Sequence, residues 1–306
     1  MKRFILLLLS FLLVACSTVP KTEVAGTVDL NDLQPLPTSE NSEAVPLRVA
    51  IAAVISPKGT LESYSPLLEY LETKLHRPVE LIQRRTYLEI NDLVEHGAVD
   101  IAFVCTSAYV QGHDTFGMEL LVAPQVNGGT TYNSLLIVPA ESGAQSMDDL
   151  RGKVFAFTDP ISLTGRVYPT SLIQQLGFTP EEFFARTFFT YSHDEAIRAV
   201  ASGLADGAAV DSLVFEYALA RDPSLKEQVR VIHTSPDFGI PPVVVSPFTR
   251  PQVKAELQAL LLGMANDPLA KDALAAVGVE RFVLIEDSAY NSVRALVGEV
   301  PVPETP

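Results

Sequence analysis

A strand–helix–strand pattern that occurs twice is the feature that most constrains the fold. Short apolar runs rich in valine and isoleucine alternate with longer segments whose apolar residues recur at helical spacing. In the first block, strands are expected at residues 47–54, 79–83 and 99–104, and helices at 64–75 and 88–96. This alternation favours an α/β fold with parallel strands.

The block at residues 153–231 repeats the pattern. Gly97-Ala98-Val99-Asp100 and Gly203-Leu204-Ala205-Asp206 share one layout, in which a helix is followed by Gly-x-x-Asp and a strand. Further strands are expected at 135–138 and 243–246, on either side of the second block. We therefore predict two similar lobes, the second inserted into the first, with one ligand cleft at the strand carboxyl ends. Lobe 1 is expected to span residues 46–138 plus 240–300, and lobe 2 residues 139–239.

A hydroxyl-bearing turn in the second block is a candidate anion site. Asp159-Pro160-Ile161-Ser162-Leu163-Thr164-Gly165 follows the apolar run at 154–157 and precedes a helix that should end near Leu176. Such a turn directs unpaired backbone N–H groups and the hydroxyls of Ser162 and Thr164 at one point near a helix N-terminus. The alternative is that one of these hydroxyls only caps the helix.

The first 45 residues have the composition of a targeting segment and a tether. Lys2 and Arg3 precede an apolar run that is too short to span a bilayer, so residues 1–15 are expected to be a signal peptide. Leu13-Val14-Ala15-Cys16 is similar to a bacterial lipobox, in which the cysteine thiol carries a diacylglycerol. An incidental cysteine after an ordinary signal peptide is the alternative. Residues 16–45 are then an acylated flexible tether, and 301–306 a disordered tail.

Composition and motifs argue against several function classes. The formal net charge of −15 argues against nucleic acid as a partner. The sequence has no Gly-x-Ser-x-Gly elbow, no phosphate-binding Gly-x-x-x-x-Gly-Lys loop and no His-Glu-x-x-His helix. The five histidines show no metal-ligand spacing. We therefore expect no catalytic residues, no metal and no cofactor, and we interpret Cys105 as a small core residue.

Three segments together resemble a known family, the phosphonate-type periplasmic binding proteins of ABC importers. They are Tyr64-Ser65-Pro66-Leu67, Asp159-Pro160-x-Ser162-x-Thr164-Gly165, and Ser192-His193-Asp194 with Gly203 and Asp206. The resemblance covers about residues 47–295. It implies a two-lobe Venus-flytrap fold, the type II periplasmic-binding-protein fold. Such a protein closes on a small phosphorus oxyanion, which can be phosphonate, phosphite or phosphate, and delivers it to a membrane permease.

The resemblance also implies roles for individual residues. Ser162, Thr164 and the backbone of Gly165 match the oxyanion cradle, and His193 matches a histidine of the cleft. Asp211 matches the position that meets the distal end of the ligand. Tyr64, Tyr109 and Tyr132 are candidates for the aromatic wall of the cleft. Leu163 departs from the family pattern, because phosphonate receptors often have a third hydroxyl there.

Other readings of several residues remain open. His193 and Asp211 can each serve only as helix caps, and the tyrosines can be ordinary core residues. Arg166, next to the turn, is most simply a solvated side chain. At the level of function, a lipid-anchored monomeric receptor of an ABC importer, facing the periplasm or outer surface, is the main hypothesis. The alternatives are an anion sensor without transport and a surface lipoprotein whose cleft has lost its ligand.

Overall fold

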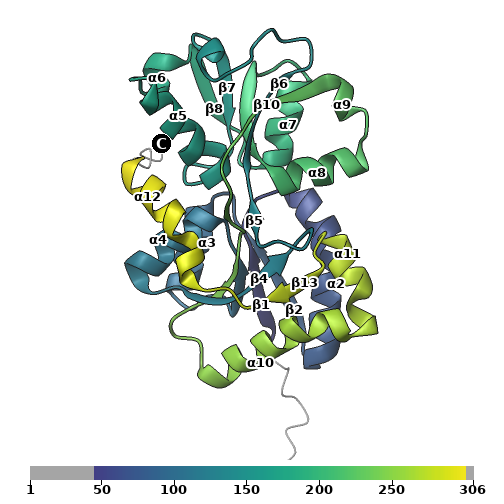
Figure 1. Cartoon of the computed structure of the whole chain (residues 1–306). Helices are drawn as coiled ribbons and strands as arrows, with labels where there is room; N and C mark the ends of the chain where they lie inside the picture. The colour runs from purple at the N-terminus through teal and green to yellow at the C-terminus, as the bar shows by residue number, and fades with distance from the viewer. Residues whose placement is uncertain (1–44, 301–306) are drawn as a thin grey trace, which may run out of the picture. The chain divides into compact units, whose positions relative to one another are not determined.

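The computed structural model describes residues 45–300 of the 306-residue chain. The expected signal peptide, the lipidation site Cys16, nearly all of the tether and the tail at 301–306 lie outside the described residues. Within them, two mixed sheets carry helices on both faces (Figure 1). No helix in this part of the chain has the length and apolarity needed to cross a bilayer.

The first sheet has six strands in the order β13-β4-β12-β3-β1-β2. Strands β1, β2 and β3 are parallel, whereas β12 runs antiparallel to β3 and β4, and β13 runs antiparallel to β4. The strands are β1 (Leu47–Ile51), β2 (Val79–Gln83), β3 (Ile101–Phe103), β4 (Glu119–Gln125), β12 (Val243–Val245) and β13 (Arg281–Val283).

The second sheet has five strands in the order β10-β6-β9-β7-β8. Strands β7, β8 and β9 are parallel, and β6 and β10 extend the sheet antiparallel. The strands are β6 (Ser134–Pro139), β7 (Val154–Phe157), β8 (Arg186–Phe189), β9 (Gly207–Asp211) and β10 (Val229–Thr234).

The two sheets share one topology, as the repeated sequence pattern predicts. Strands β1, β2 and β3 correspond to β7, β8 and β9, and in each sheet an antiparallel strand from elsewhere in the chain lies beside the third of them. The sequence analysis assigned no direction to the strands expected at 135–138 and 243–246, and both run antiparallel to their neighbours. The expected boundary at residue 138 differs, because β6 pairs entirely within the second sheet and the chain has crossed by Ser134.

The helices cover both faces of each sheet (Figure 1). Helix α2 starts at Pro57 rather than at the expected Tyr64, because Ser56 caps it and Pro57 fits the first helical turn. The α-helices are α2 (Pro57–Leu75), α3 (Tyr87–Glu95), α4 (Thr106–Phe116), α5 (Tyr168–Gln175), α6 (Pro180–Phe183), α7 (His193–Ala201), α8 (Ser212–Arg221), α9 (Leu225–Gln228), α10 (Pro251–Gly263), α11 (Lys271–Ala276) and α12 (Asn291–Glu299). Short helical turns are η1 (Asp148–Leu150), η2 (Leu163–Val167), η3 (Met264–Asn266), η4 (Pro268–Ala270) and η5 (Asp287–Tyr290).

The chain passes between the sheets through a short two-stranded ribbon. Strand β5 (Thr131–Tyr132) pairs antiparallel with β11 (Phe238–Gly239). One apolar cluster continues across this region, because Leu163 and Val167 near the second sheet pack with Tyr87 of α3. The two halves of the fold are therefore packed against each other in this structure.

Candidate functional site

The candidate anion loop lies between β7 and α5, where it forms a single wide turn. Ser162 is the N-cap of the π-helical turn η2, and its Oγ accepts a hydrogen bond from the N–H of Gly165 at 3.1 Å. The capping interpretation therefore holds for Ser162. Because its oxygen is the acceptor in that bond, the hydroxyl proton stays available for a second partner.

Two threonine hydroxyls in this loop are buried without a partner. Thr158 and Thr164 are 0% and 1% exposed, and neither hydroxyl has a hydrogen-bond partner among residues 45–300. Burying a hydroxyl without a partner costs about 1–3 kcal/mol. Most buried hydroxyls in native proteins are hydrogen-bonded, so two unpaired hydroxyls in one loop mark a candidate ligand site.

His193 lies at the start of α7 and faces the same loop. Its Nδ1 accepts the backbone N–H of Asp211 at 3.0 Å, and its Nε2 lies 3.4 Å from Ser162 Oγ. Burial lowers the pKa of His193 to about 3, against a smaller opposing effect of Asp194. The ring is therefore neutral at pH 7, and its proton is on Nε2, directed at the anion loop.

Asp211 ends β9 and caps α8. Its Oδ1 accepts the N–H groups of Leu213 at 2.7 Å and Val214 at 3.3 Å. Burial raises the pKa of Asp211 to about 7, although the two N–H bonds lower it, and the nearby Glu216 adds to the rise. The capping interpretation is thus correct, and the carboxyl group can also hold a proton near neutral pH.

The charge of Asp211 acts on the pKa values of three tyrosines. The charge of Asp211 adds to the effect of burial in raising the pKa values of Tyr64, Tyr87 and Tyr132, and that of Tyr64 reaches about 12. Tyr87 and Tyr132 are 0% and 2% exposed, and within the described residues their hydroxyls have no partner. Both phenols are free to donate to an anion. The sequence analysis missed Tyr87, which occupies the first position of α3.

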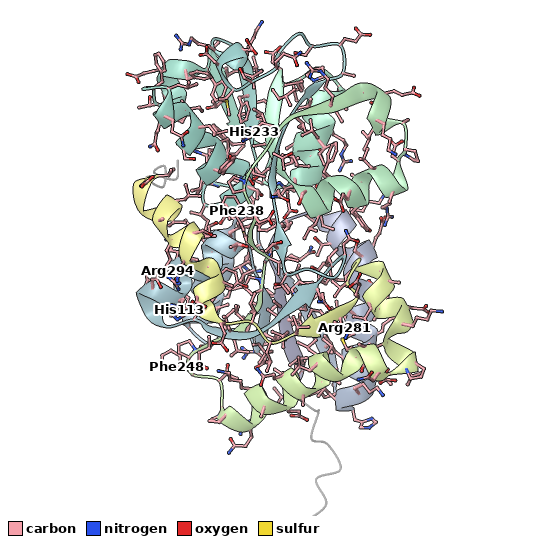
Figure 2. The ribbon with its side chains drawn as sticks, viewed as in Figure 1. His113, His233, Phe238, Phe248, Arg281 and Arg294 are labelled. Atoms are coloured by element: carbon pink, nitrogen blue, oxygen red, sulfur yellow. The ribbon has the colours of Figure 1, made fainter. Side chains whose placement is uncertain are left out.

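Tyr109 is placed differently. Its hydroxyl donates to Asp287 Oδ1 at 2.6 Å, and its ring packs against Tyr290 with the centroids 4.8 Å apart. Asp287 also accepts from Arg294 at 2.6 Å, and Figure 2 shows Arg294 beside His113. The phenol proton is committed to this network, so Tyr109 is not grouped with the unpaired donors.

Asp159 links the anion loop to the first half of the fold. Its Oδ2 accepts the backbone N–H of Tyr87 at 3.0 Å, and its Oδ1 that of Ile161 at 2.9 Å. Burial raises the pKa of Asp159 to about 6. The loop is therefore held in place by a carboxylate bonded to the N-terminus of α3.

Two neighbours of the loop are apolar in character. Leu163 is fully buried in the apolar cluster that joins the halves of the fold. Cys105, 3% exposed, belongs to the same cluster, and burial raises the pKa of its thiol while the backbone N–H of Leu163 lowers it. The thiol and the loop are thus in contact across the two halves.

Arg166 corrects one expectation, because it is buried rather than solvated. It is 5% exposed, and its guanidinium lies 4.7 Å from the ring centroid of Phe157 and bonds to Thr170. Burial lowers its pKa, and Glu181 has the opposite effect. The guanidinium therefore packs inside the second half of the fold, and its Nε is one of the buried polar atoms without a hydrogen-bond partner in the described residues.

The site is thus a buried group of neutral donors next to acidic side chains. The donors are Ser162, Thr158, Thr164, Tyr87, Tyr132 and Nε2 of His193. The charged neighbours that act on the pKa values of Asp211 and Asp159 are Glu216 and Glu89, both acidic. The arrangement can bind an oxyanion by hydrogen bonds, and its charge favours one that retains a proton.

The pKa of Asp211 makes the first testable prediction. A carboxyl group whose pKa is higher in the folded state stabilises the fold most at low pH, and this stability is lost as pH rises through the folded value. The loss is about 1.4 kcal/mol for each unit of pKa difference. Between pH 4 and pH 8 the ligand-free protein should therefore lose more free energy of unfolding than Asp211→Asn, whose amide oxygen keeps the cap. Urea unfolding at each pH measures how the free energy of unfolding of the wild type and of Asp211→Asn changes with pH. An equal change in both proteins would contradict the raised pKa of Asp211.

Comparison with known proteins agrees with this geometry. Residues 49–290 match the family of periplasmic substrate-binding proteins of phosphonate ABC transporters. The phosphate-import protein PhnD of Mycolicibacterium smegmatis is 26% identical over 243 residues, which cover 75% of this chain and 76% of that protein.

Solved structures confirm the two-lobe periplasmic-binding-protein fold. A binding protein component of an ABC phosphonate transporter from Pseudomonas aeruginosa has a TM-score of 0.77 at 23% identity, covering 82% of this chain and 85% of that one. A protein from Prochlorococcus marinus in complex with methylphosphonate has a TM-score of 0.73 at 19% identity, covering 83% of this chain and 97% of that one. With the family match over most of the chain, the conclusion is direct: this protein belongs to the periplasmic substrate-binding proteins of phosphonate ABC transporters.

Proposed function

We propose that this chain is the receptor of an ABC importer and captures a small phosphorus oxyanion by closing its two lobes around it. The observation that carries the proposal is the set of buried hydroxyls without partners, Thr158 and Thr164 from one lobe and Tyr87 and Tyr132 from the other lobe and the crossing ribbon. An oxyanion accepts several hydrogen bonds at once, so it satisfies these donors together. Ser162, His193 and the loop backbone at Gly165 complete the proposed donor set.

The acidic surroundings define the charge of the proposed ligand. The charge of Asp211 acts on the pKa of Tyr64, and its own pKa of about 7 lets it keep a proton or accept one from the ligand. A monoprotonated phosphonate, phosphite or phosphate supplies such a proton, and an aminophosphonate supplies a cation instead. Tyr64, whose ring packs edge-on against Phe103 at 5.4 Å, then forms an aromatic wall near the same carboxyl group.

Titration of the soluble domain with phosphate, phosphite, methylphosphonate and aminoethylphosphonate tests the proposal. A ligand at about 100 times its dissociation constant should add about 2.7 kcal/mol to the free energy of unfolding. Thermal shift ranks the anions, and calorimetry measures the dissociation constant of the one that stabilises the protein most. Sulfate at the same ionic strength is the control, because it offers oxygens but no proton at neutral pH. No shift with any phosphorus anion would remove the proposed function.

We also propose that Cys16 carries the lipid that anchors the receptor at the membrane, where it meets the ABC permease. The support is the short apolar run ending in Leu-Val-Ala-Cys. Cys16→Ala should therefore abolish labelling by radioactive palmitate and release the protein from the membrane fraction, without changing the affinity of the folded domain. Palmitate still incorporated into that variant would rule out this attachment site.

A further inference from the structure

A polar contact close to the proposed site joins the two lobes directly. Val54 O, which follows β1, accepts the backbone N–H of His193 at 2.9 Å. Two residues further on, the N–H and the hydroxyl of Ser56 both donate to the carboxylate of Asp194, at 2.8 and 2.6 Å. Each lobe thus contributes a helix start, α2 capped by Ser56 and the first turn of α7.

The carboxylate of Asp194 is ionised and held in place by its own helix. Burial alone would raise its pKa, yet the hydrogen bonds from Ser56 and the charge of Arg198 lower it. Arg198, one turn later on α7, donates to Asp194 Oδ2 at 2.9 Å. The carboxylate is therefore ionised, held by its own helix, and presented to the other lobe.

A second pair of contacts lies along the same side of the fold. Ser63 on α2 and Tyr217 on α8 are joined by a hydrogen bond of 2.6 Å between their hydroxyls. Arg221 on α8 reaches Glu62 on α2 at 3.2 Å. Glu62, Tyr217 and Arg221, together with the Ser56–Asp194 pair, line a groove of about 580 Å³ between α2, α7 and α8.

We propose that Ser56 and Asp194 form a latch that positions His193 and holds the closed lobes together. The proposal rests on capture by lobe closure, and it adds two residues that do not touch the ligand. Asp194 follows His193 directly, so the lobe contact and the ligand contact occupy the same helical turn. Breaking the latch should let the lobes separate sooner, which raises the rate of ligand release.

A double-mutant cycle tests the latch on Ser56→Ala, Asp194→Ala and the double variant. Stopped-flow measures the release and association of methylphosphonate, or of phosphite, phosphate or aminoethylphosphonate if that compound binds more tightly. Each single variant should release the anion about tenfold faster with an unchanged association rate, and the double variant should release it no faster than the worse single variant. Asp194→Asn retains one acceptor oxygen and should lie between Asp194→Ala and the wild type.

The matched control is Ser65→Ala on the same helix, where the hydroxyl donates only to the Leu61 carbonyl of α2. Capping roles for Ser56 and Asp194 would lower the melting temperature but leave the release rate unchanged, and that result would overturn the latch. Independent effects that multiply in the double variant would overturn it as well.

A ligand-free measurement separates this inference from the proposed function. Small-angle scattering should give a larger radius of gyration for Ser56→Ala than for the wild type and Ser65→Ala. If the wild type binds none of the four phosphorus compounds, the proposed function fails, and the latch is decided by the radius alone. An equal radius in that case would overturn the latch.

Discussion

Gly165→Ala is expected to weaken anion binding strongly and to destabilise the fold. A Cβ at this position would lie 1.8 Å from Thr158 Oγ1 and 2.7 Å from its Cβ and Cγ2, distances at which the loop must move. Overpacking of this kind costs about 1–3 kcal/mol. Because the shift displaces several donors of the loop together, affinity should fall at least about a hundredfold. Calorimetry measures the affinity and differential scanning calorimetry the stability.

A matched glycine shows whether the close approach is the cause. A Cβ at Gly143, also in the second lobe, would meet no atom within 4 Å, so Gly143→Ala should change neither quantity. Thr158→Gly removes all three overlapping atoms, and adding it to Gly165→Ala should restore part of the lost stability. Wild-type affinity in Gly165→Ala would mean that the anion is bound elsewhere.

Tyr87→Phe is expected to change stability and affinity in opposite directions. Its hydroxyl is buried without a partner in the described part of the chain, so removing it should raise the stability of the ligand-free protein, by up to about 3 kcal/mol. The same change removes a donor to a charged oxygen, which should weaken anion binding about ten- to a hundredfold. A tyrosine that only packs would leave the affinity unchanged, and calorimetry with the best anion decides between the two.

Tyr290→Phe provides the converse control. Tyr290 is also fully buried, but its hydroxyl donates to the Ile240 carbonyl at 3.0 Å. Losing that bond leaves a buried carbonyl with one partner fewer, so Tyr290→Phe should lower the stability by about 1 kcal/mol and leave the affinity unchanged. If Tyr87→Phe and Tyr290→Phe change stability and affinity in the same way, the unpaired hydroxyl of Tyr87 does not bind the anion.

Much of the fold was predictable because local patterns determine it. The parallel strands of each lobe are short apolar runs, and the duplicated Gly-x-x-Asp segments identified the two related units. The antiparallel strands β12 and β6 were not predictable as such. Their direction depends on where the chain crosses between lobes, and an apolar run such as Val243–Val245 reads the same in either direction.

The site was predictable only where a residue's role depends on its neighbours in sequence. Ser162 and Thr164 follow a strand and precede a helix, so the loop was visible. Tyr87 was missed because it directly precedes the helix expected at 88–96 and a tyrosine there resembles any core residue. Only the fold shows that its hydroxyl is unpaired within the described residues. Tyr109 depends on Asp287, which lies 178 residues away in the chain. Sequence patterns do not contain such distant pairings.

The position of Cys105 gives this protein a built-in chemical reporter. The sequence has two cysteines, so a soluble form that begins after Cys16 has a single thiol. That thiol is 3% exposed and lies against the anion loop of the opposite lobe. In the proposed closure mechanism, a thiol reagent reaches the Cys105 thiol while the lobes are apart. The labelling rate of the unmodified domain therefore measures the fraction of time that the protein spends open, with no attached fluorophore.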